Sequence, residues 1–523
     1  MIFEMGTDKN DYYLKIGKAS DLEDSKERFL FRLFEIFPGA MSWLILLLAV
    51  FLSWKKPFWV AIFIICFVVF WFFRTIYFSI YLWFSYKKME KNKKINWLQR
   101  LANLSKKDKK ADWKKIYHLI IIPMYKEPLE IVRENFQFLE KSDYPKERMI
   151  VVLACEERAR SFVEKTARVI KEEFGSKFFR FLVTWHPDNI PGELAGKGSN
   201  ETWAARKAKE KIIDPLKIPY ENIIFSSLDV DTCVFPKYFS CLTYYYLTSK
   251  NPERTSFQPI PLYINNAWQA PIISYIFSFS STFWHTINQE RQHRLITFSS
   301  HSMSFKTLVE VDFKQTNIVP DDSRIFWQCF LKYNGDYKVQ PLHYPISMDM
   351  NVAESFWKTM INLYKQQRRW AYGVNDIPYI FFGFLKNKKI PLRKKIILGS
   401  ALLEDHITWA TSSILIFLLG WLPLVLGGEK FTQTTISYNL PRIISKIMNI
   451  SMLGLILSIY LSFSILSSKS TSFKKSRCLV FAFGWILFPL TMIIFSSLPA
   501  LDAQTRLMLG RYMGFWVTEK VRK

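Results

Sequence analysis

Two carboxylates separated by a single residue follow an apolar run in the stretch "LDVDTCVFP". Asp229 and Asp231 alternate with a valine, so in an extended segment both side chains face the same side. Two anionic groups that leave a buried strand are costly unless a positive charge meets them. A divalent cation such as Mg²⁺ or Mn²⁺, which can also bridge phosphates, is the natural partner for such oxygens. The spacing therefore favours a metal site over the alternative, a turn capped by an aspartate.

A second pair of carboxylates, Asp321 and Asp322, follows a proline and precedes a predicted helix in "IVPDDSRIFW". One of them could be the helix N-cap, a common position for aspartate. The other could act as a general base, because a carboxylate can take the proton of an attacking hydroxyl group.

The stretch "YKQQRRWAYG" (residues 364–373) places two arginines beside two glutamines and a tryptophan, before the last long apolar segments. Basic residues with a tryptophan can form a plain lipid anchor at a membrane surface. An anchor could equally use lysines, so the paired glutamines and the arginine fork indicate a binding role. Of the two arginines, Arg368 is the one assigned to the lipid side.

Residues 85–405 mix charge with short apolar runs, as a globular domain does. β-Branched runs stopped by proline or charge are typical of buried parallel strands, and helical stretches lie between them. This alternation predicts an α/β domain with a parallel sheet, in which ligands bind at the carboxyl ends of the strands. The predicted strands are residues 117–123, 148–154, 180–185 and 222–231, and the predicted helices include residues 128–141 and 157–174.

The loops after the predicted strands offer further polar groups. "PMYKEP" ends the first strand with Tyr125 and Glu127, although an ordinary turn into a helix would have the same composition. "AGKGSNET" has glycines around Lys197, followed by Asn200. A flexible backbone with a lysine suits the approach of a phosphate, but this composition alone is not specific.

Five apolar segments predict membrane spans, the first of them short unless it begins near Phe34. The basic segment "KKMEKNKKINWLQRLANLSKKDKK" and residues 468–477 are then cytoplasmic by the positive-inside rule. Five spans would put the basic C-terminal tail outside, so either a re-entrant segment is present or the tail folds back as an interfacial helix. Residues 1–34 lack the apolar core of a signal peptide. The predicted spans are residues 41–54, 57–73, 406–427, 444–466 and 479–498.

Composition narrows the class of protein. Half of the 523 residues are hydrophobic and 17% are aromatic, which suits a membrane protein with a folded soluble part. The net charge of +26 requires an anionic partner. Lipid headgroups or phosphorylated substrates fit better than nucleic acid, for which no binding motif is present. The six cysteines are scattered without a CxxC pair, so neither a disulfide framework nor a zinc site is predicted.

Taken in order, these motifs resemble those of the membrane-embedded family 2 glycosyltransferases, which include cellulose synthases, hyaluronan synthases and ceramide glucosyltransferases. The resemblance runs from about Trp113 to the C-terminus. Its elements are "PMYKEP", "GKGSNET", "LDVD" as DxD, "VPDD" in place of a TED-like triplet, and "QQRRW" as QxxRW. It implies a GT-A-like cytosolic domain with a mainly parallel sheet, and helical spans on both sides of it.

The resemblance also implies the activity, the inverting transfer of a sugar from a nucleoside diphosphate, preferably UDP. A metal and an arginine fork would stabilise the departing diphosphate, and a carboxylate would deprotonate the acceptor hydroxyl. Trp370 offers an apolar face to a sugar ring, and Gln366 can bind hydroxyl groups. The implied roles are nucleotide-sugar binding for Tyr125, Glu127, Glu156, Lys197 and Asp229, Mg²⁺ or Mn²⁺ binding for Asp229 and Asp231, general base for Asp322, and acceptor or pyrophosphate contact for Asp321, Gln366, Arg369 and Trp370.

Three positions depart from the family pattern or fall outside it. Glu156 in "ACEER" stands where the family usually has an aspartate for the nucleobase, so the preference for uridine is less secure. "VPDD" leaves two candidates for the base, of which we favour Asp322 over Asp321. His301 lies in "FSSHSMSF", beside the predicted acceptor helix, and is interpreted as a polar loop residue rather than an acceptor contact.

Three functions stay open at this point. The first is a synthase that extends a glycan and translocates it through its own spans, which the number of spans favours. The second is transfer of one sugar to a membrane lipid, and the third is an inactive scaffold or transporter, which the intact motifs argue against. In each case we expect a multi-pass protein of the cell membrane with a cytoplasmic domain. The expected parts are a polar N-terminal segment (1–34), a transmembrane hairpin (35–85), a glycosyltransferase domain (86–390), interfacial helices carrying QxxRW (352–405), C-terminal transmembrane helices (406–500) and a basic tail (501–523).

Overall fold

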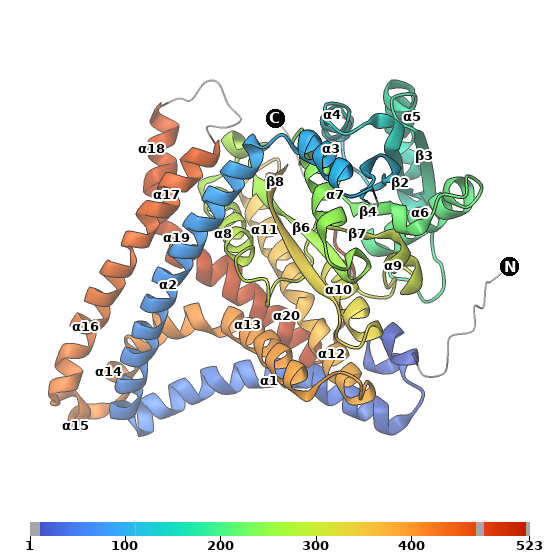
Figure 1. Cartoon of the computed structure of the whole chain (residues 1–523). Helices are drawn as coiled ribbons and strands as arrows, with labels where there is room; N and C mark the ends of the chain where they lie inside the picture. Colours follow the sequence, from blue (N-terminus) through green and yellow to red (C-terminus); the bar gives the residue numbers. More distant parts are fainter. Residues whose placement is uncertain (1–10, 110, 467–474, 519–523) are drawn as a thin grey trace.

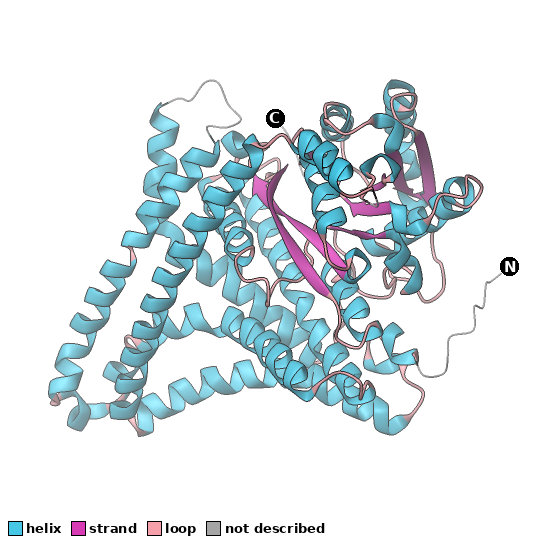
Figure 2. Cartoon of the chain, in the orientation of Figure 1, coloured by secondary structure: helices cyan, strands magenta, loops and turns pink. Residues whose placement is uncertain are grey.

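An eight-stranded sheet with the strand order β3-β2-β1-β4-β7-β6-β8-β5 forms the centre of the α/β domain. The computed structural model describes residues 11–109, 111–466 and 475–518. The domain lies at one end of the molecule and long helices lie at the other (Figure 1 and Figure 2). The strands are β1 (Tyr117–Met124), β2 (Met149–Glu156), β3 (Arg180–His186), β4 (Ile223–Ser227), β5 (Cys233–Val234), β6 (Thr255–Tyr263), β7 (Ser302–Ser304) and β8 (Lys338–Met348).

The predicted parallel part of the sheet is confirmed. β1 pairs in parallel with β2 and with β4, and β2 pairs in parallel with β3. Both faces of these strands are covered, so successive residues belong to two different cores. Ile120 and Val151 share one core with residues of α4 (Leu129–Glu140), α5 (Arg160–Phe174) and α7 (Tyr238–Thr248). Ile121 and Val152 share the other with residues of α6 (Lys197–Ala208), which explains why the strands are apolar throughout.

The remaining strands were not predicted from the sequence. β6 and β8 run parallel to each other, whereas the short β7 is antiparallel to both β4 and β6, and β5 is antiparallel to β8. β6 contains Pro259 and Pro261, and its register with β8 shifts between Gln258 and Ile260. Most pairs remain parallel, so the predicted class is confirmed: an α/β domain with a mainly parallel sheet, and apolar helices before and after it in the sequence.

Within the described residues, five helical segments are long and apolar enough to cross a membrane, as predicted. Four of them contain their predicted apolar stretch and extend beyond it, whereas α13 begins earlier than predicted, at Leu392, and ends at Leu419, before the predicted end at residue 427. α1 begins at Ser25, where the side chain of Asp24 accepts a hydrogen bond of 2.8 Å from the Glu27 amide. The segments are α1 (Ser25–Lys55), α2 (Pro57–Lys94), α13 (Leu392–Leu419), α16 with α17 (Thr435–Leu466), and the run from Arg477 to Met508 that includes α18 (Lys475–Gly484), α19 (Phe488–Met492) and α20 (Leu498–Met508).

The shorter helices connect these parts. α2 and α16 pack together along one edge of the molecule, and α1 crosses beneath the domain beside α13 and α20 (Figure 1). The other helices are α3 (Trp97–Lys107), α8 (Ile272–Asn288), α9 (Phe305–Glu310), α10 (Asp321–Lys332), α11 (Phe356–Ala371), α12 (Asp376–Lys386), α14 (Leu422–Leu426) and α15 (Gly428–Thr432).

The C-terminal tail does not form the predicted interfacial helix in its described residues, 509–518. α20 ends at Met508, and Gly510 takes a positive φ of 70°, a common way to end a helix and turn the chain. The chain then follows the α/β domain, where the Met513 amide donates to the Tyr372 hydroxyl over 3.4 Å. The predicted cytoplasmic loop 468–477 lies mostly outside the described residues.

The N-terminal segment also contacts the domain. The hydroxyl of Tyr379 donates to the Leu14 carbonyl over 3.1 Å, and the Asn375 amide donates to the Gly17 carbonyl over 3.2 Å. Both described ends of the chain therefore lie on the side of the domain. If the apolar helices cross a membrane, the tail and the domain lie on the same side of it, so an even number of crossings separates them. Three long apolar segments lie between the domain and the tail, so not all three can cross completely.

Candidate active site

Lys197, the first residue of α6, contacts two other predicted site residues through its ammonium group, and all three come from distant segments. The Lys197 Nζ atom lies 2.6 Å from Oδ1 of Asp229, in the loop after β4, and 2.9 Å from Oδ2 of Asp322, in the first turn of α10. Asp229 Oδ2 also accepts a hydrogen bond from the Ser299 hydroxyl. The carboxyl end of β4 and the start of α10 are thus joined through one lysine.

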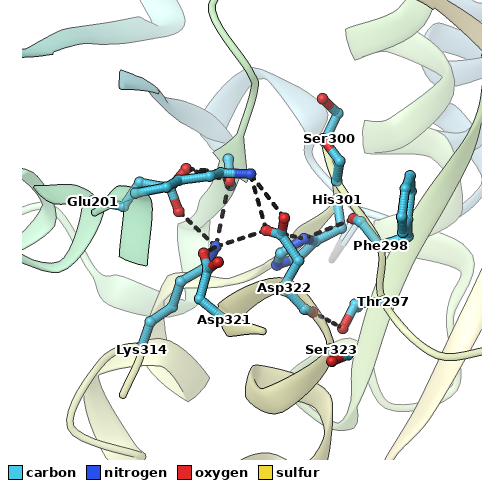
Figure 3. A network of polar contacts seen from close by, with 12 residues as sticks. Glu201, Thr297, Phe298, Ser300, His301, Lys314, Asp321, Asp322 and Ser323 are labelled. Carbon is cyan, nitrogen blue, oxygen red and sulfur yellow. Dashed lines mark hydrogen bonds and ion pairs between the residues drawn. The ribbon is translucent and has the colours of Figure 1, made fainter. Parts of the chain in front are cut away.

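A second lysine, Lys314, lies behind the first and contacts three carboxylates. Its Nζ atom is 2.5 Å from Glu201 Oε2, 3.2 Å from Asp321 Oδ2 and 3.1 Å from Asp322 Oδ1 (Figure 3). The lysine is buried, as are Glu201 and Asp321, whereas the Asp322 side chain is 21% exposed. Two ammonium groups therefore lie among four carboxylates, those of Glu201, Asp229, Asp321 and Asp322.

The two neighbouring aspartates of α10 differ in their ionisation. Burial alone would raise the pKa of Asp322, but the ammonium groups of Lys197 and Lys314 hold that pKa well below its usual range. Burial and the adjacent charge of Asp322 raise the pKa of Asp321 to about 6, against the opposing effect of Lys314. Pro320, not an aspartate, is the N-cap of α10. Asp322 is therefore the ionised and more exposed carboxylate, and its lowered pKa makes it a weak proton acceptor while both lysines contact it.

His301 lies in the loop directly before β7, as predicted, but its imidazole is buried beside Asp322. Its Nδ1 atom lies 3.1 Å from the Phe298 carbonyl oxygen and 3.7 Å from Asp322 Oδ1. Burial lowers the pKa of His301 to about 3, so the ring is neutral. In the neutral ring, an Nδ1–H group can donate to the carbonyl, which fixes the ring against the base.

The predicted metal ligands have oxygen donors that suit Mg²⁺ or Mn²⁺. Asp231 is buried, and its Oδ2 accepts a hydrogen bond of 3.0 Å from the Asp349 amide at the end of β8. Asp229 faces Lys197, so a cation bound there must share this carboxylate or displace the ammonium group. The group of three close carboxylates in the described residues is a different one, Glu201, Asp321 and Asp322, whose ligand atoms lie within 4.8 Å of one another.

The residues predicted for the nucleotide lie at the ends of β1 and β2. Glu127 accepts hydrogen bonds from the amides of Tyr125, at 2.7 Å, and Lys126, at 3.1 Å. Glu156 pairs with Arg158 over 2.5 Å, and the Arg158 guanidinium lies 4.5 Å from the centre of the Tyr125 ring. The two strand ends are thus linked through Arg158, beside a small cavity that Glu156 also lines.

The QxxRW residues lie at the end of α11, and their side chains have different surroundings. The Trp370 ring packs between Tyr263, at 6.3 Å, and Phe298, at 5.6 Å. Burial lowers the pKa of Arg369, and the charges of Asp229, Asp321 and Asp322 oppose that effect, so the guanidinium lies within electrostatic range of these carboxylates. Gln366 is farther from this centre, and its Oε1 accepts from the Asn351 amide over 3.4 Å.

Arg368 does not take the lipid-facing role assigned to it from the sequence. Its guanidinium donates to Asp502 of α20 over 2.9 Å, and its side chain is 22% exposed. Asp502 in turn accepts from Arg506 over 2.8 Å, one helical turn later. The first arginine of the pair therefore joins α11 to the last apolar segment, whereas the second lies against the Phe515 ring.

Sequence reasoning missed several residues of this region. Lys314 and Ser299 belong to no recognisable motif, and their positions become clear only in the fold. Phe515 of the tail lies over the site, with its ring centre 4.9 Å from the Arg369 guanidinium. The neighbouring Trp516 lies under Lys365 at 5.4 Å. An aromatic pair within a basic tail was the one sequence feature that could have indicated this contact.

The sequence matches no family model and no curated protein. Remote likenesses exist among solved structures. The mannosyltransferase PcManGT from Pyrobaculum calidifontis in complex with GDP-Man and Mn²⁺ is 11% identical, with a TM-score of 0.36 over 80% of this chain and 97% of that chain. S. aureus TarS 1–349 in complex with UDP-GlcNAc is 11% identical, with a TM-score of 0.35 over 69% and 94%. GalNAc-T7 with UDP, GalNAc and Mn²⁺ is 9% identical, with a TM-score of 0.35 over 56% and 58%.

Proposed function

We propose that this chain is a metal-dependent, inverting glycosyltransferase of the membrane, which transfers a sugar from a nucleoside diphosphate to a growing glycan. The observation that carries the proposal is the meeting of motif residues from four separate segments in one site. Lys197 contacts both Asp229 and Asp322, and the charge of Arg369 lies within electrostatic range of the same carboxylates. A fold that needed these residues only for stability would have no reason to gather them at the carboxyl end of a parallel sheet.

The donor half of the proposed site lies along the ends of β1, β2 and β4. Tyr125, Glu127 and Glu156 would line the nucleotide pocket, with a UDP-sugar favoured as the donor. Asp229 and Asp231 would hold Mg²⁺ or Mn²⁺, which neutralises charge on the diphosphate when it is bound. Lys197 and Arg369 would bind diphosphate oxygens from the protein side, with Asp321 buried beside Asp322, and Gln366 would contact the acceptor.

The proposed reaction is a direct displacement. Asp322 takes the proton of the acceptor hydroxyl while that oxygen forms a bond to C1 of the donor sugar. The bond between C1 and the diphosphate oxygen breaks, and its electron pair leaves with the diphosphate. Because the hydroxyl attacks from the opposite face, the configuration at C1 inverts. Lys197 and Arg369 stabilise the negative charge that accumulates on the leaving group.

A glycan acceptor is favoured by the surroundings of Trp370. Its indole lies between two further aromatic rings, those of Tyr263 and Phe298, and aromatic faces suit the apolar faces of sugar rings. The five long apolar segments support a position in the cell membrane. The basic residues after the first two of them favour a cytoplasmic location for the domain.

The test is incubation of the purified protein in detergent with radiolabelled sugar nucleotides and Mn²⁺, followed by sizing and solvent extraction of the products. We expect transfer that EDTA abolishes, and a product that does not extract with lipid. An extractable product would favour the lipid acceptor instead. Neither transfer nor hydrolysis of any sugar nucleotide would contradict the proposal and leave the scaffold alternative.

A further inference from the structure

The ammonium group of Lys314 is surrounded by oxygen atoms as a bound cation would be. It contacts the carboxylates of Glu201, Asp321 and Asp322 at 2.5–3.2 Å and the Ser227 hydroxyl at 3.4 Å. The side chain is 1% exposed. The positive charge among these three carboxylates is thus supplied by the chain itself (Figure 3).

The backbone around Lys314 is held in place on both sides. Its carbonyl oxygen accepts a hydrogen bond of 2.9 Å from the Thr202 hydroxyl of α6. The amide of the next residue, Gln315, donates to the Gln328 side chain of α10 over 3.1 Å. Because α6 also carries Glu201 and α10 carries both aspartates, the lysine and its partners are parts of one rigid arrangement.

The two lysines contact the two oxygens of Asp322 differently. Lys314 contacts only Oδ1, at 3.1 Å, whereas Lys197 contacts both oxygens, Oδ2 at 2.9 Å and Oδ1 at 3.1 Å. Lys197 is also bound to Asp229, at the position proposed for the diphosphate and its cation. An anionic diphosphate can attract the Lys197 ammonium away from Asp322, whereas Lys314 is enclosed by its carboxylate partners.

We propose that Lys314 is a positioning residue, a fixed internal cation that holds Oδ1 of Asp322 so that Oδ2 receives the proton of the acceptor. The inference rests on the proposed function, in which Asp322 is the general base. When the donor binds, Lys197 leaves Oδ2 for the diphosphate oxygens. Asp322 keeps its orientation because Lys314 still holds the other oxygen. The acceptor proton then passes to Oδ2, and the C1–diphosphate bond breaks as described above.

The experiment compares Lys314→Met with Lys306→Met in the full-length protein. Methionine has a similar length and no charge, so the variant removes the cation and keeps most of the volume. Lys306 pairs with Glu253 in a partly exposed position and serves as the matched control. We expect kcat of Lys314→Met to fall roughly 10²-fold, at the lower end of what a general base contributes. The donor KM should stay within about threefold, because the nucleotide contacts are intact.

A second variant separates positioning from simple charge balance. Lys314→Met leaves an excess of buried negative charge, which can impair folding. The double variant Glu201→Gln with Lys314→Met removes one carboxylate charge together with the lysine, so net charge in the cluster is preserved. The same loss of kcat in the double variant supports the inference. A kcat within about threefold of the wild-type value in either variant overturns it.

The wild-type assay distinguishes a failure of the inference on Lys314 from a failure of the proposed function. If the wild-type protein transfers sugar and Lys314→Met does so equally well, the inference fails and the proposed function stands. If the wild-type protein transfers no sugar from any nucleotide donor, both fail together. A rise in donor KM at unchanged kcat also contradicts the inference, since a residue that positions the base acts on the chemical step.

Discussion

The ammonium group of Lys197 lies 2.6 Å from a carboxylate oxygen of Asp229. This contact links the lysine loop to the DxD motif and occupies the side of the aspartate on which a cation is proposed to bind. Under the proposed function, donor binding rearranges this contact. The diphosphate attracts the Lys197 ammonium group, and the cation attracts the Asp229 carboxylate. The Lys197 ammonium group and the Asp229 carboxylate would then each bind a part of the donor complex instead of each other.

The first prediction concerns the two neighbouring aspartates. We expect Asp322→Asn to lower kcat by about 10²–10⁴-fold, since an amide cannot accept the acceptor proton. Asp321→Asn should retain much more activity, because this side chain is buried and less accessible to an acceptor than Asp322. Radiolabelled sugar transfer by the two purified variants measures both effects. Full turnover by Asp322→Asn would show that another group is the base.

The second prediction compares the two arginines of the QQRRW stretch. Arg369→Lys should lower kcat/KM on the order of 10²-fold, because a single ammonium group cannot replace the planar fork proposed to bind the diphosphate. Arg368→Lys should leave kcat/KM nearly unchanged. Its pair with Asp502 is partly exposed, and such a pair contributes about 1 kcal/mol or less to stability. Steady-state kinetics and thermal unfolding of both variants test this division. Equal kinetic losses would argue against it.

The third prediction tests the contact between the tail and the lysine loop. A Cβ atom at Gly196 would lie 2.6 Å from the ring of Phe515, so Gly196→Ala must displace the aromatic side chain. We expect faster tryptic cleavage after Arg511 in this variant, detected by mass spectrometry of the C-terminal peptide. Adding Phe515→Ala makes room for the new methyl group.

The matched control for this experiment is Gly514→Ala, where a Cβ atom meets nothing within 4 Å. It should leave the rate of cleavage at its wild-type value. Unchanged cleavage in Gly196→Ala would show that the loop, rather than the tail, yields to the added methyl group.

Local patterns in the sequence predicted the parallel half of the sheet. β1 to β4 are short apolar runs between helices, and burial on both faces requires that composition. β6 and β8 were not predicted because each contains prolines, Pro259 and Pro261 in β6 and Pro341 and Pro345 in β8. Proline lacks the N–H group that donates the hydrogen bonds between paired strands, so a proline in the sequence argues against predicting a strand there. Their pairing depends on tertiary contacts and on a register shift that no local pattern encodes.

The candidate site was predictable where residue types recur at fixed local spacing. Asp229, Asp322 and Arg369 were found in this way, because each belongs to a short motif. Lys314 was not found, since an isolated lysine is usually a surface residue and only the fold encloses it. The role of Arg368 was assigned wrongly for a similar reason. Its partner Asp502 lies in the last apolar segment, and the sequence gives no indication that the two helices meet.

The last prediction concerns the dependence of stability on pH. The raised pKa of Asp321 means that the folded protein holds this proton more tightly than the unfolded chain. The corresponding stability is therefore present below the unfolded pKa, near 4, and is lost as the pH rises through about 6. Asp321→Asn cannot lose a proton, so we expect it to gain thermal stability relative to the wild-type protein between pH 5 and pH 8.

Asp322→Asn provides the comparison of opposite sign. The lysines lower the pKa of Asp322, so the ionised carboxylate stabilises the folded state above the unfolded pKa, and this stability is lost only as the pH falls. Asp322→Asn should thus be less stable than the wild-type protein at pH 7. Unfolding midpoints in detergent from pH 5 to pH 8 measure both trends. A parallel pH dependence for Asp321→Asn and the wild-type protein would contradict the raised pKa of Asp321.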